Sequence, residues 1–503
     1  MSKLKAIDLV VNAINNSTLC WCHWKSNDKL HSTYQGDTDL DLLFHRVDIE
    51  KVKNLMESIG AVEFKTCRYR RHQWISDFYI IDKQTGKLVH LHLHFGLSVG
   101  EKQFKDFELP FTDDILAARR LVAESDFWIP SPEHEYILLM LRLALRQPRF
   151  TSSRRSDTII PNAYLKEIKW LIPQINGKRL RQYVKNWVPS KELARIVLKI
   201  ADNYKDYNSS ELKRAAHNIY QGYRTTTVWV RFYKATMLNI YVRLERIPFV
   251  SWFLSSKKRL AHSGQDMILV LTGLDGSGKT TLLDSIEQHL SKEFTVRRFY
   301  FGHGKSGRSI IVRSTQFLAG VINRFTPKYH AKLQYSYTAK AVLAMGFSIH
   351  KTLSLITLKI ASAAGMIILV DRFPQVQNTC YSDGLINLRD DNKKNFFAVR
   401  LIEKLQRKVF SAIISFTRPT LIAKLQAGID ILVNRKPSTV NRLELEAQMD
   451  IFKRLIFAPN ASHITIDTGS VSIEEASRVL LVLLWKEFGI KYRATSENFK
   501  TGN

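Results

Sequence analysis

The sequence predicts an α/β protein whose second half is a doubly wound parallel sheet, preceded by a smaller α/β domain with a helical extension. Three observations support this prediction. Residues 267–272 form an unbroken apolar run that ends in a glycine-rich turn, as in a strand covered on both faces. Helical and strand patterns alternate from 263 to 490, and a separate group of short strands precedes residue 126. With 503 residues, the chain is long enough for more than one domain.

The first domain is expected to span residues 1–126. Helical spacing in the first 16 residues places a set of apolar side chains on one face. A helix is predicted over 48–59, with Gly60 after its last turn. Strands are predicted at 40–44, 61–64, 73–81 and 88–95. This mixture is typical of a small α/β domain.

The middle segment, residues 127–262, is predicted to be helical and holds much of the positive charge. It has 25 basic and 9 acidic side chains, which is +16 of the net +29 of the chain. Such a field favours a polyanion, an anionic membrane surface or a phosphorylated substrate. A solvated basic face is the alternative.

Residues 228–254 combine this charge with aromatic side chains. Arg231, Lys234 and Arg246 are predicted to lie outside the apolar face. A basic amphipathic helix of this kind suits a membrane surface. The alternative is that the apolar face packs on the domain that follows. The residues predicted to share that face are Trp229, Tyr233, Met237, Ile240, Leu244 and Ile247.

The second domain is expected to span 263–490, with a tail over 491–503. Its clearest strands are 267–272, 366–370, 421–425 and 464–467. The apolar run 353–370 contains Lys359 and Gly365, so it predicts a helix leading into a strand and no membrane span. The first residues lack a signal-like apolar run, and the four cysteines show no metal-binding spacing. We therefore expect a cytoplasmic protein, with peripheral membrane attachment and a homodimer among the open alternatives.

A phosphate-binding loop follows the strand 267–272. The segment 273–281 is Gly-Leu-Asp-Gly-Ser-Gly-Lys-Thr-Thr, which matches the P-loop pattern between a strand and a helix. Lys279 is predicted to neutralise the β- and γ-phosphates of ATP, and the Thr280 hydroxyl to bind Mg²⁺. The predicted nucleotide contacts are Gly273, Asp275, Gly276, Ser277, Gly278, Lys279, Thr280 and Thr281.

Asp275 within this loop, together with the doubled Thr280-Thr281, resembles the thymidylate kinase family of nucleoside monophosphate kinases. The resemblance covers roughly residues 265–490. It implies ATP-dependent phosphoryl transfer, with Asp275 contacting the sugar hydroxyl of the acceptor. The alternative is that Asp275 only caps the loop.

A second motif, Asp371-Arg372-Phe373-Pro374, ends the strand 366–370 and is similar to an Asp-Arg-aromatic motif of that family. Ligands of open parallel sheets bind at the carboxyl ends of strands. Asp371 is predicted to hold Mg²⁺ or its water, and Arg372 to bridge donor and acceptor phosphates. A structural ion pair is the alternative.

A basic segment around Pro437 resembles the lid of the same family. Gly276 occupies the loop position where some members of the family place an arginine. Members that lack this arginine supply the positive charge from the lid. Arg435, Lys436 and Arg442 are therefore candidates for stabilising charge in the transition state. A solvated basic loop is the alternative.

The acceptor side departs from the family. Residues 299–304, Phe-Tyr-Phe-Gly-His-Gly, stand where an Arg-Glu-Pro-Gly contact is usual, and the polar residues expected for a thymine ring are not evident after Arg372. The acceptor therefore stays open between a nucleoside monophosphate, such as a dTMP-like nucleotide, and another phosphorylated molecule.

The first domain resembles the nucleotidyltransferase superfamily through the turn at 24–26 and the segment 36–43, Gly-Asp-Thr-Asp-Leu-Asp-Leu-Leu. Alternation places Asp39 and Asp41 on one strand face, suited to Mg²⁺. Lys25 stands where glycine is usual, and the later strand offers histidines in place of a third carboxylate. These could bind a transition metal with the aspartates, or form a half-polar strand face. They are His90, His92 and His94.

Three functions follow from these motifs. The first is phosphoryl transfer from ATP to a nucleotide or another phosphorylated acceptor. The second is a regulatory protein that uses the P-loop as an ATP-driven switch at a polyanion or membrane. The third is nucleotidyl transfer by the first domain, although its missing third carboxylate predicts impaired activity.

Overall fold

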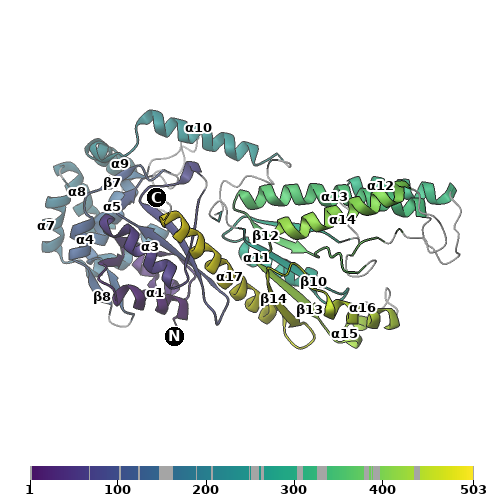
Figure 1. Cartoon of the computed structure of the whole chain (residues 1–503). Coiled ribbons are helices and arrows are strands. Elements are labelled where there is room, and N and C mark those ends of the chain that lie inside the picture. Colours follow the sequence, from purple (N-terminus) through teal and green to yellow (C-terminus); the bar gives the residue numbers. More distant parts are fainter. Residues whose placement is uncertain are drawn as a thin grey trace. The chain divides into compact units, whose positions relative to one another are not determined.

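The chain forms two compact units, residues 1–246 and 247–503, in a computed structural model (Figure 1). The residues that the structure describes are 3–66, 68–100, 104–122, 125–146, 162–188, 190–204, 208–247, 250, 260–261, 266–302, 310–325, 337–378, 384–386, 388, 397–435 and 442–501.

The first unit is built on a five-stranded sheet of order β1-β2-β5-β4-β3. Strands β2 and β5 are parallel, and the other neighbours are antiparallel. This sheet confirms the strands predicted in the first domain. The strands are β1 (Trp21–His23), β2 (Leu40–Phe44), β3 (Val62–Phe64), β4 (Ile75–Ile81) and β5 (Leu88–His94). Two small hairpins accompany it, β6 (Leu97–Val99) with β7 (Phe107–Leu109), and β8 (Arg120–Val122) with β9 (Phe127–Ile129).

Helices surround this sheet, and the two faces of β2 enter different apolar cores. Leu40 and Leu42 pack with Ile7 of α1, whereas Leu43 packs with the later helices. The early helical elements are α1 (Lys5–Asn15), η1 (Asn27–Lys29), α2 (Leu30–Tyr34), η2 (Arg46–Asp48), α3 (Ile49–Ser58), η3 (Arg68–Arg70) and α4 (Thr112–Ala117). The later ones are α5 (Pro132–Leu145), α6 (Asn162–Leu171), η4 (Ile172–Gln174), α7 (Gly177–Trp187), α8 (Lys191–Asp202), α9 (Ser209–Ile219), η6 (Tyr220–Tyr223) and α10 (Val228–Leu244).

The helices predicted as a separate extension belong to the first unit. Tyr136 of α5, Leu193 of α8 and Leu212 of α9 share one core with Cys22 of β1 and Leu43 of β2. Because these apolar side chains bury one another, the compact unit continues to Arg246 and does not end at residue 126.

Helix α10 buries a different face from the one predicted. Arg231, expected outside the apolar face, is buried and lies 3.3 Å from the buried carboxylate of Asp106. Leu238 is also buried, whereas Trp229 and Tyr233 are exposed. A buried carboxylate needs a cationic partner, so the ion pair decides which side of the helix faces inward.

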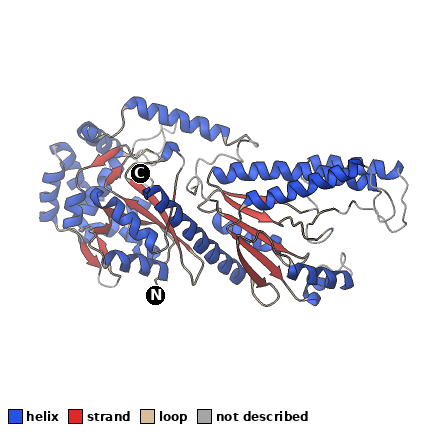
Figure 2. Cartoon of the chain, viewed as in Figure 1, coloured by secondary structure: helices blue, strands red, loops and turns tan. Residues whose placement is uncertain are grey.

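The second unit contains a fully parallel sheet of order β11-β12-β10-β13-β14. Figure 2 shows its strands between two layers of helices. This is the predicted mixed α/β class with a parallel sheet. The strands are β10 (Ile268–Gly273), β11 (Val296–Tyr300), β12 (Ile367–Asp371), β13 (Leu421–Gln426) and β14 (Ser462–Asp467).

The helices of the second unit cover both sheet faces. Helices α13 and α14 bury Leu358 and Ile413 against one face, while α11 and α17 pack together on the other. The segment predicted as a tail continues α17 through Thr501. The helices are α11 (Lys279–Leu290), α12 (Ile310–Phe325), α13 (Tyr337–Ala363), α14 (Phe397–Thr417), α15 (Ile429–Arg435), α16 (Arg442–Arg454) and α17 (Ile473–Thr501).

One helix of the described residues, α13 over Thr338–Ala363, is long and apolar enough to span a membrane by length and composition alone. The sequence predicted no such helix, because α13 begins well before the apolar run 353–370. Part of the helix is core: Leu358 and Ala361 are fully buried against the sheet.

Candidate functional site

The phosphate loop joins the central strand β10 to α11. Gly276 and Gly278 have φ angles of +87° and +81°, which glycine adopts without strain. A Cβ at Gly273 would lie 2.7 Å from the carbonyl oxygen of Leu425 on β13. The glycines therefore let the chain turn tightly beside β13 and enter the helix at Lys279.

Lys279 lies inside the curve of this loop. Its side chain is buried, and Nζ donates hydrogen bonds to the carbonyl oxygens of Gly273 at 2.8 Å and Leu274 at 2.6 Å. Thr280 and Thr281 follow on the exposed first turn of α11. A lysine and a helix N-terminus at one place form a site for phosphate.

Asp371 ends β12, the neighbour of β10, and is paired in register with Leu271. One carboxylate oxygen, Oδ2, accepts a hydrogen bond from Arg298 at 3.3 Å. The other oxygen, Oδ1, is buried and has no hydrogen-bond partner among the described residues. A buried carboxylate oxygen without a donor fits a nearby cation or its water.

Arg372 forms an ion pair with Asp275 of the phosphate loop. The sequence assigned these two residues separate roles toward the acceptor, and the structure places them in contact. Arg372 has a φ of +64°, a strained conformation for a side chain with a Cβ, and its N–H donates to the Leu271 carbonyl at 2.9 Å. The strand end therefore holds the guanidinium at the loop.

Sequence reasoning missed the part played by β11. Arg298 connects Asp371 to Asp284 on α11, with Nη1 2.5 Å from the Asp284 carboxylate. A Cβ at Gly302 would lie 2.5 Å from Cδ of Arg372 and 2.3 Å from the Tyr300 hydroxyl. Glycine at 302 thus leaves room for both side chains. The doubled Arg297-Arg298 on β11, the strand that follows the P-loop helix in the sequence, was the available signal.

The two arginines predicted to belong to a lid, Arg435 and Arg442, lie in different surroundings. Arg435 ends α15 and donates to the carbonyl oxygens of Gly276 at 3.3 Å and Thr468 at 2.9 Å. Arg442 begins α16 and pairs with Asp430 at 2.9 Å and Glu446 at 3.3 Å. Only Arg435 of this pair contacts the phosphate loop. Lys436 and Pro437 lie outside the described residues.

The acceptor side is described only in part. Residues 303–304 and 381–383 lie outside the described residues. After Phe373, Gln375 and Asn378 bond each other: the Gln375 amide nitrogen donates to the Asn378 carbonyl, and the Asn378 N–H donates to the Gln375 side chain, both at 2.7 Å. These two side chains therefore stabilise their own turn.

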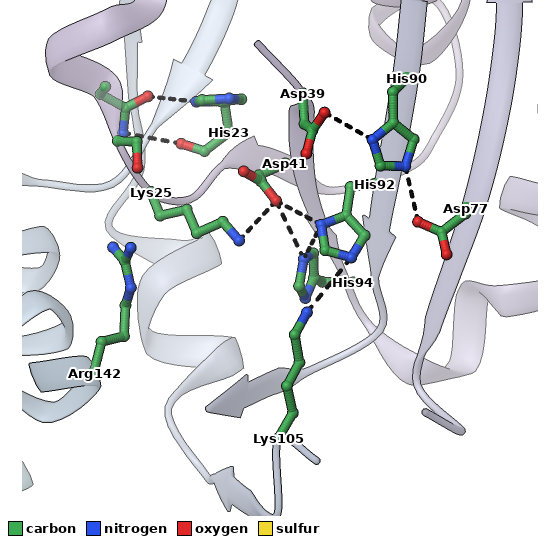
Figure 3. A network of polar contacts seen from close by, with 12 residues as sticks. His23, Lys25, Asp39, Asp41, Asp77, His90, His92, His94, Lys105 and Arg142 are labelled. Atoms are coloured by element: carbon green, nitrogen blue, oxygen red, sulfur yellow. Dashed lines mark hydrogen bonds and ion pairs between the residues drawn. The ribbon is translucent and has the colours of Figure 1, made fainter. Parts of the chain in front are cut away.

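The first unit contains a second polar cluster (Figure 3). Asp39 and Asp41 lie on the same side of the sheet, as predicted, but they have different partners. Asp39 is 2.8 Å from Nδ1 of His90, and the other ring nitrogen of His90 is 2.8 Å from Asp77 on β4. Sequence reasoning missed Asp77, which is paired in register with His92.

Asp41 is surrounded by Lys25, His92 and His94. Its Oδ1 lies 2.8 Å from Lys25 Nζ, 2.8 Å from His92 Nδ1 and 3.4 Å from His94 Nε2. Burial acts to raise the pKa of Asp41, but Lys25 and the imidazoles outweigh it, and the pKa lies well below its usual range. Lys105 lies on the other side of His92, and its Nζ is 3.5 Å from His92 Nε2. Burial, followed by the positive charge of Lys25, lowers the pKa of Lys105 to about 7.

The turn before η1 has its N–H groups already bonded. The N–H of Ser26 donates to Glu167 at 3.1 Å, and that of Asn27 donates to Glu135 at 3.2 Å. A turn that binds phosphate needs N–H groups directed at the ligand. The carboxyl oxygens of Glu167 and Glu135 accept from those donors, which does not favour nucleoside triphosphate binding at this turn.

No protein-family model matches the chain. Among curated proteins, it is similar to the uncharacterized ATP-binding protein YghR of Escherichia coli K12 and to YghR of Escherichia coli O6:H1 strain CFT073. Each is 25% identical over 199 residues, which cover 37% of this chain and 75% of the relative. The name of these relatives describes them as ATP-binding.

Two solved structures are also similar. The chain is 14% identical to the thymidylate kinase from Candida albicans, with a TM-score of 0.29 over 45% of this chain and 93% of that one. It is 15% identical to APE1195, with a TM-score of 0.24 over 44% and 97%. Scores this low do not by themselves establish a shared fold. The assignment to a P-loop type of fold depends on the parallel sheet and the loop between β10 and α11.

Proposed function

We propose that the second unit transfers the γ-phosphoryl group of ATP to a nucleoside monophosphate or another phosphorylated acceptor. The observation that carries this proposal is the ion pair between Arg372 and Asp275. An ATP-driven switch needs the loop and its lysine, but it has no need of a strained arginine fixed beside the loop. A phosphotransferase does need such a group, because two phosphates must be held together.

The proposed roles follow from position. Lys279 and the N-terminus of α11 bind the β- and γ-phosphates. Arg372 is held where an incoming anionic acceptor would meet the loop, and it would exchange Asp275 for a phosphate. Arg435 adds charge next to Gly276. Phosphoryl transfer depends mainly on such positioning and charge stabilisation.

The residues around the loop also fit Mg²⁺. The Thr280 hydroxyl and Oδ1 of Asp371, which has no hydrogen-bond partner in the described part of the chain, are oxygen ligands of the kind that this ion prefers. When bound, Mg²⁺ would neutralise part of the charge on the ATP phosphates. The name of the YghR proteins, which describes ATP binding, agrees with the donor half of the proposal.

The test is a transfer assay on the full chain with γ-labelled ATP. The acceptor panel contains nucleoside monophosphates including dTMP, phosphosugars and lipid-linked sugars. We expect label to pass stoichiometrically to one acceptor class. Lys279→Ala should lower transfer by about 100-fold or more while circular dichroism stays unchanged. Lys292→Ala, an exposed lysine just beyond α11, is the matched control and should be neutral.

Other outcomes of these assays would indicate a different function. Unchanged ATP turnover in a folded Lys279→Ala protein would contradict the role of the loop. ATP hydrolysis that is stimulated by a polyanion or lipid, without a labelled product, would indicate a regulatory switch. Pyrophosphate release that is lost in an Asp39→Asn/Asp41→Asn variant would indicate nucleotidyl transfer by the first unit.

A further inference from the structure

Three potential metal ligands converge on one point in the first unit. Asp41 on β2 is paired in register with His92 on the parallel strand β5, and His94 follows two residues later on the same face. Asp41 and His94 are buried and His92 is nearly so. Figure 3 shows the carboxylate and both rings directed toward one another.

The three ligand atoms form a compact triangle. Asp41 Oδ1 is 2.8 Å from His92 Nδ1 and 3.4 Å from His94 Nε2, and the two ring nitrogens are 3.2 Å apart. A point about 1 Å above this triangle is about 2.1 Å from all three atoms, a distance typical of zinc bonds to imidazole and carboxylate. The strand register and the side-chain rotamers together therefore preform one face of a coordination sphere.

A hydrogen-bonded cluster and a bound cation are two alternative ways to satisfy these three atoms. A neutral imidazole carries one N–H, so each of these rings can direct either a donor or a lone pair at the centre. If one ring donates and the other presents a lone pair, hydrogen bonds link the three groups. If both rings present lone pairs, a single cation at the centre would satisfy all three atoms together.

Asp39, which immediately precedes β2, does not join this group. Its carboxylate contacts His90, and the ring of His90 connects it to Asp77. Asp39 thus belongs to a neighbouring Asp-His-Asp chain of contacts. The structure separates the two aspartates that the sequence grouped as one magnesium pair.

We propose that Asp41 Oδ1, His92 Nδ1 and His94 Nε2 bind one divalent transition-metal ion of the zinc type, with Asp39 outside the ligand set. This site is in the first unit and goes beyond the proposed phosphoryl transfer. Two imidazoles and one carboxylate suit zinc or iron, whereas Mg²⁺ prefers oxygen ligands. Three protein ligands leave at least one position open, as at catalytic zinc sites.

The protonation states agree with this geometry. Burial lowers the pKa of His92 to about 4 and holds the pKa of His94 well below its usual value. Both rings are therefore neutral near pH 7, and Asp41 is ionised. Metal ligands need these forms.

Lys25 competes for the same carboxylate. Its Nζ lies 2.8 Å from Asp41 Oδ1, so the ammonium satisfies the charge that a metal ion would otherwise satisfy. Lys25 is on a long side chain that can withdraw. Metal binding therefore displaces it, and replacing it with an uncharged residue of similar length should favour the metal.

The experiment measures zinc binding to the untagged full chain by calorimetry after removal of bound metal with a chelator. We expect one Zn²⁺ per chain, and cobalt substitution should give visible d–d absorption. Asp41→Asn and His94→Gln should each weaken zinc binding by about 100-fold or more. Asp39→Asn is the matched control, two residues away in the sequence, and should keep wild-type affinity. Circular dichroism and thermal melting establish that each variant is folded.

Several results would overturn the proposal. One is the absence of stoichiometric zinc binding to the wild-type chain. Another is that Asp39→Asn and Asp41→Asn weaken metal binding equally and the chain also binds Mg²⁺. That result would indicate that the two carboxylates together are the metal ligands. Zinc binding that persists in Asp41→Asn would place the ion elsewhere, for example on cysteines.

Lys25→Met gives a second, independent measurement. If Lys25 competes with the metal, this variant should bind zinc about tenfold more tightly, and zinc should raise its melting temperature more than that of the wild type. Weaker zinc binding by a folded Lys25→Met chain would contradict a metal ion at Asp41.

Discussion

Two arginines near the P-loop differ in what holds them. Arg435 is exposed but donates to backbone carbonyls of Gly276 and Thr468, so its guanidinium lies at the loop without a ligand. Arg442 is more than half exposed and pairs with Asp430 and Glu446. Exposed pairs of that kind contribute little to stability and are easily exchanged. The two side chains should therefore differ in their importance for phosphoryl transfer.

We predict that Arg435→Ala lowers kcat for transfer by about 100-fold or more, with a smaller effect on ATP affinity. The reason is that charge beside Gly276 acts mainly on the transition state. Arg442→Ala is the matched control and should lower kcat by less than about tenfold. Steady-state kinetics on the accepted substrate measure both. If Arg442→Ala has the larger effect, α16 rather than α15 carries the lid charge.

Glu135 is a buried carboxyl group whose protonation should affect stability. Burial, followed by the neighbouring Glu167 carboxylate, raises its pKa from 4.5 to about 8, despite donors from Asn27 and the charge of Arg142. The folded chain therefore binds a proton between these two pH values that the unfolded chain releases. The stability that this proton provides is fully present below about pH 4.5 and is lost as the pH rises through about 8.

We predict that Glu135→Gln flattens the pH dependence of stability between about pH 5 and 8. The slope removed is up to about 1.4 kcal/mol per pH unit. Urea unfolding of the wild type and the variant across this range measures it, with the exposed Glu50→Gln as a control. Parallel curves for the wild type and Glu135→Gln would show that Glu135 stays ionised in the folded chain.

The sequence predicts single residues for a candidate phosphate site, but not the contacts that these residues make. Lys279 and Asp275 belong to a local motif, and Asp371 and Arg372 follow an apolar strand. The contacts between them join residues far apart: Arg372 is 97 positions from Asp275, and Arg298 is 73 from Asp371. Such pairs depend on strand order, and the order β11-β12-β10 becomes evident only in the folded sheet.

At the scale of elements, buried strands were more predictable than helix orientation. Strands β2, β5 and β10 have continuous or alternating apolar patterns. The bounds that these patterns predict lie close to the bounds of the strands in the structure. Helix α10 was placed correctly, but its inward face was not. One distant carboxylate, Asp106, attracts Arg231 into the interior, and helical periodicity contains no information about that partner.

This orientation leaves aromatic side chains on the surface of α10. Trp229 is 82% exposed, Phe232 60% and Tyr233 56%. The same helix carries Lys234 and Arg243 and lies within the basic segment 127–262. Aromatic side chains beside lysine and arginine suit the interface of an anionic bilayer. We therefore propose that α10 contacts anionic lipid.

We predict that the chain co-sediments with phosphatidylglycerol vesicles and not with phosphatidylcholine vesicles. Replacing Trp229, Phe232 and Tyr233 with alanine should weaken this binding by about tenfold or more, because their burial in the interface is lost. Phe325→Ala, an exposed aromatic on α12, should have no effect. Unchanged vesicle binding by the triple variant would contradict the proposal, and binding to nucleic acid instead would indicate a polyanion.

At the scale of the whole chain, chemistry is divided between two units with separate cores. The aspartate-histidine cluster lies on the sheet of residues 1–246, and the phosphate loop lies on the sheet of residues 247–503. Each cluster is built from strands of its own sheet. The sequence predicts both sheets, because each has its own set of apolar strands. The predicted end of the first domain, residue 126, lies well before the end of the first unit at Arg246.

We predict that the two sites act independently. Asp39→Asn with Asp41→Asn should leave labelled phosphoryl transfer within about twofold of wild type, because substitutions that share no partners usually act additively. In turn, Lys279→Ala should leave zinc affinity unchanged. Both measurements use the full chain, so each variant serves as the folding control for the other. A loss of transfer in the double aspartate variant, with Lys279 and its loop intact, would show that the first unit regulates or completes the phosphoryl-transfer site of the second.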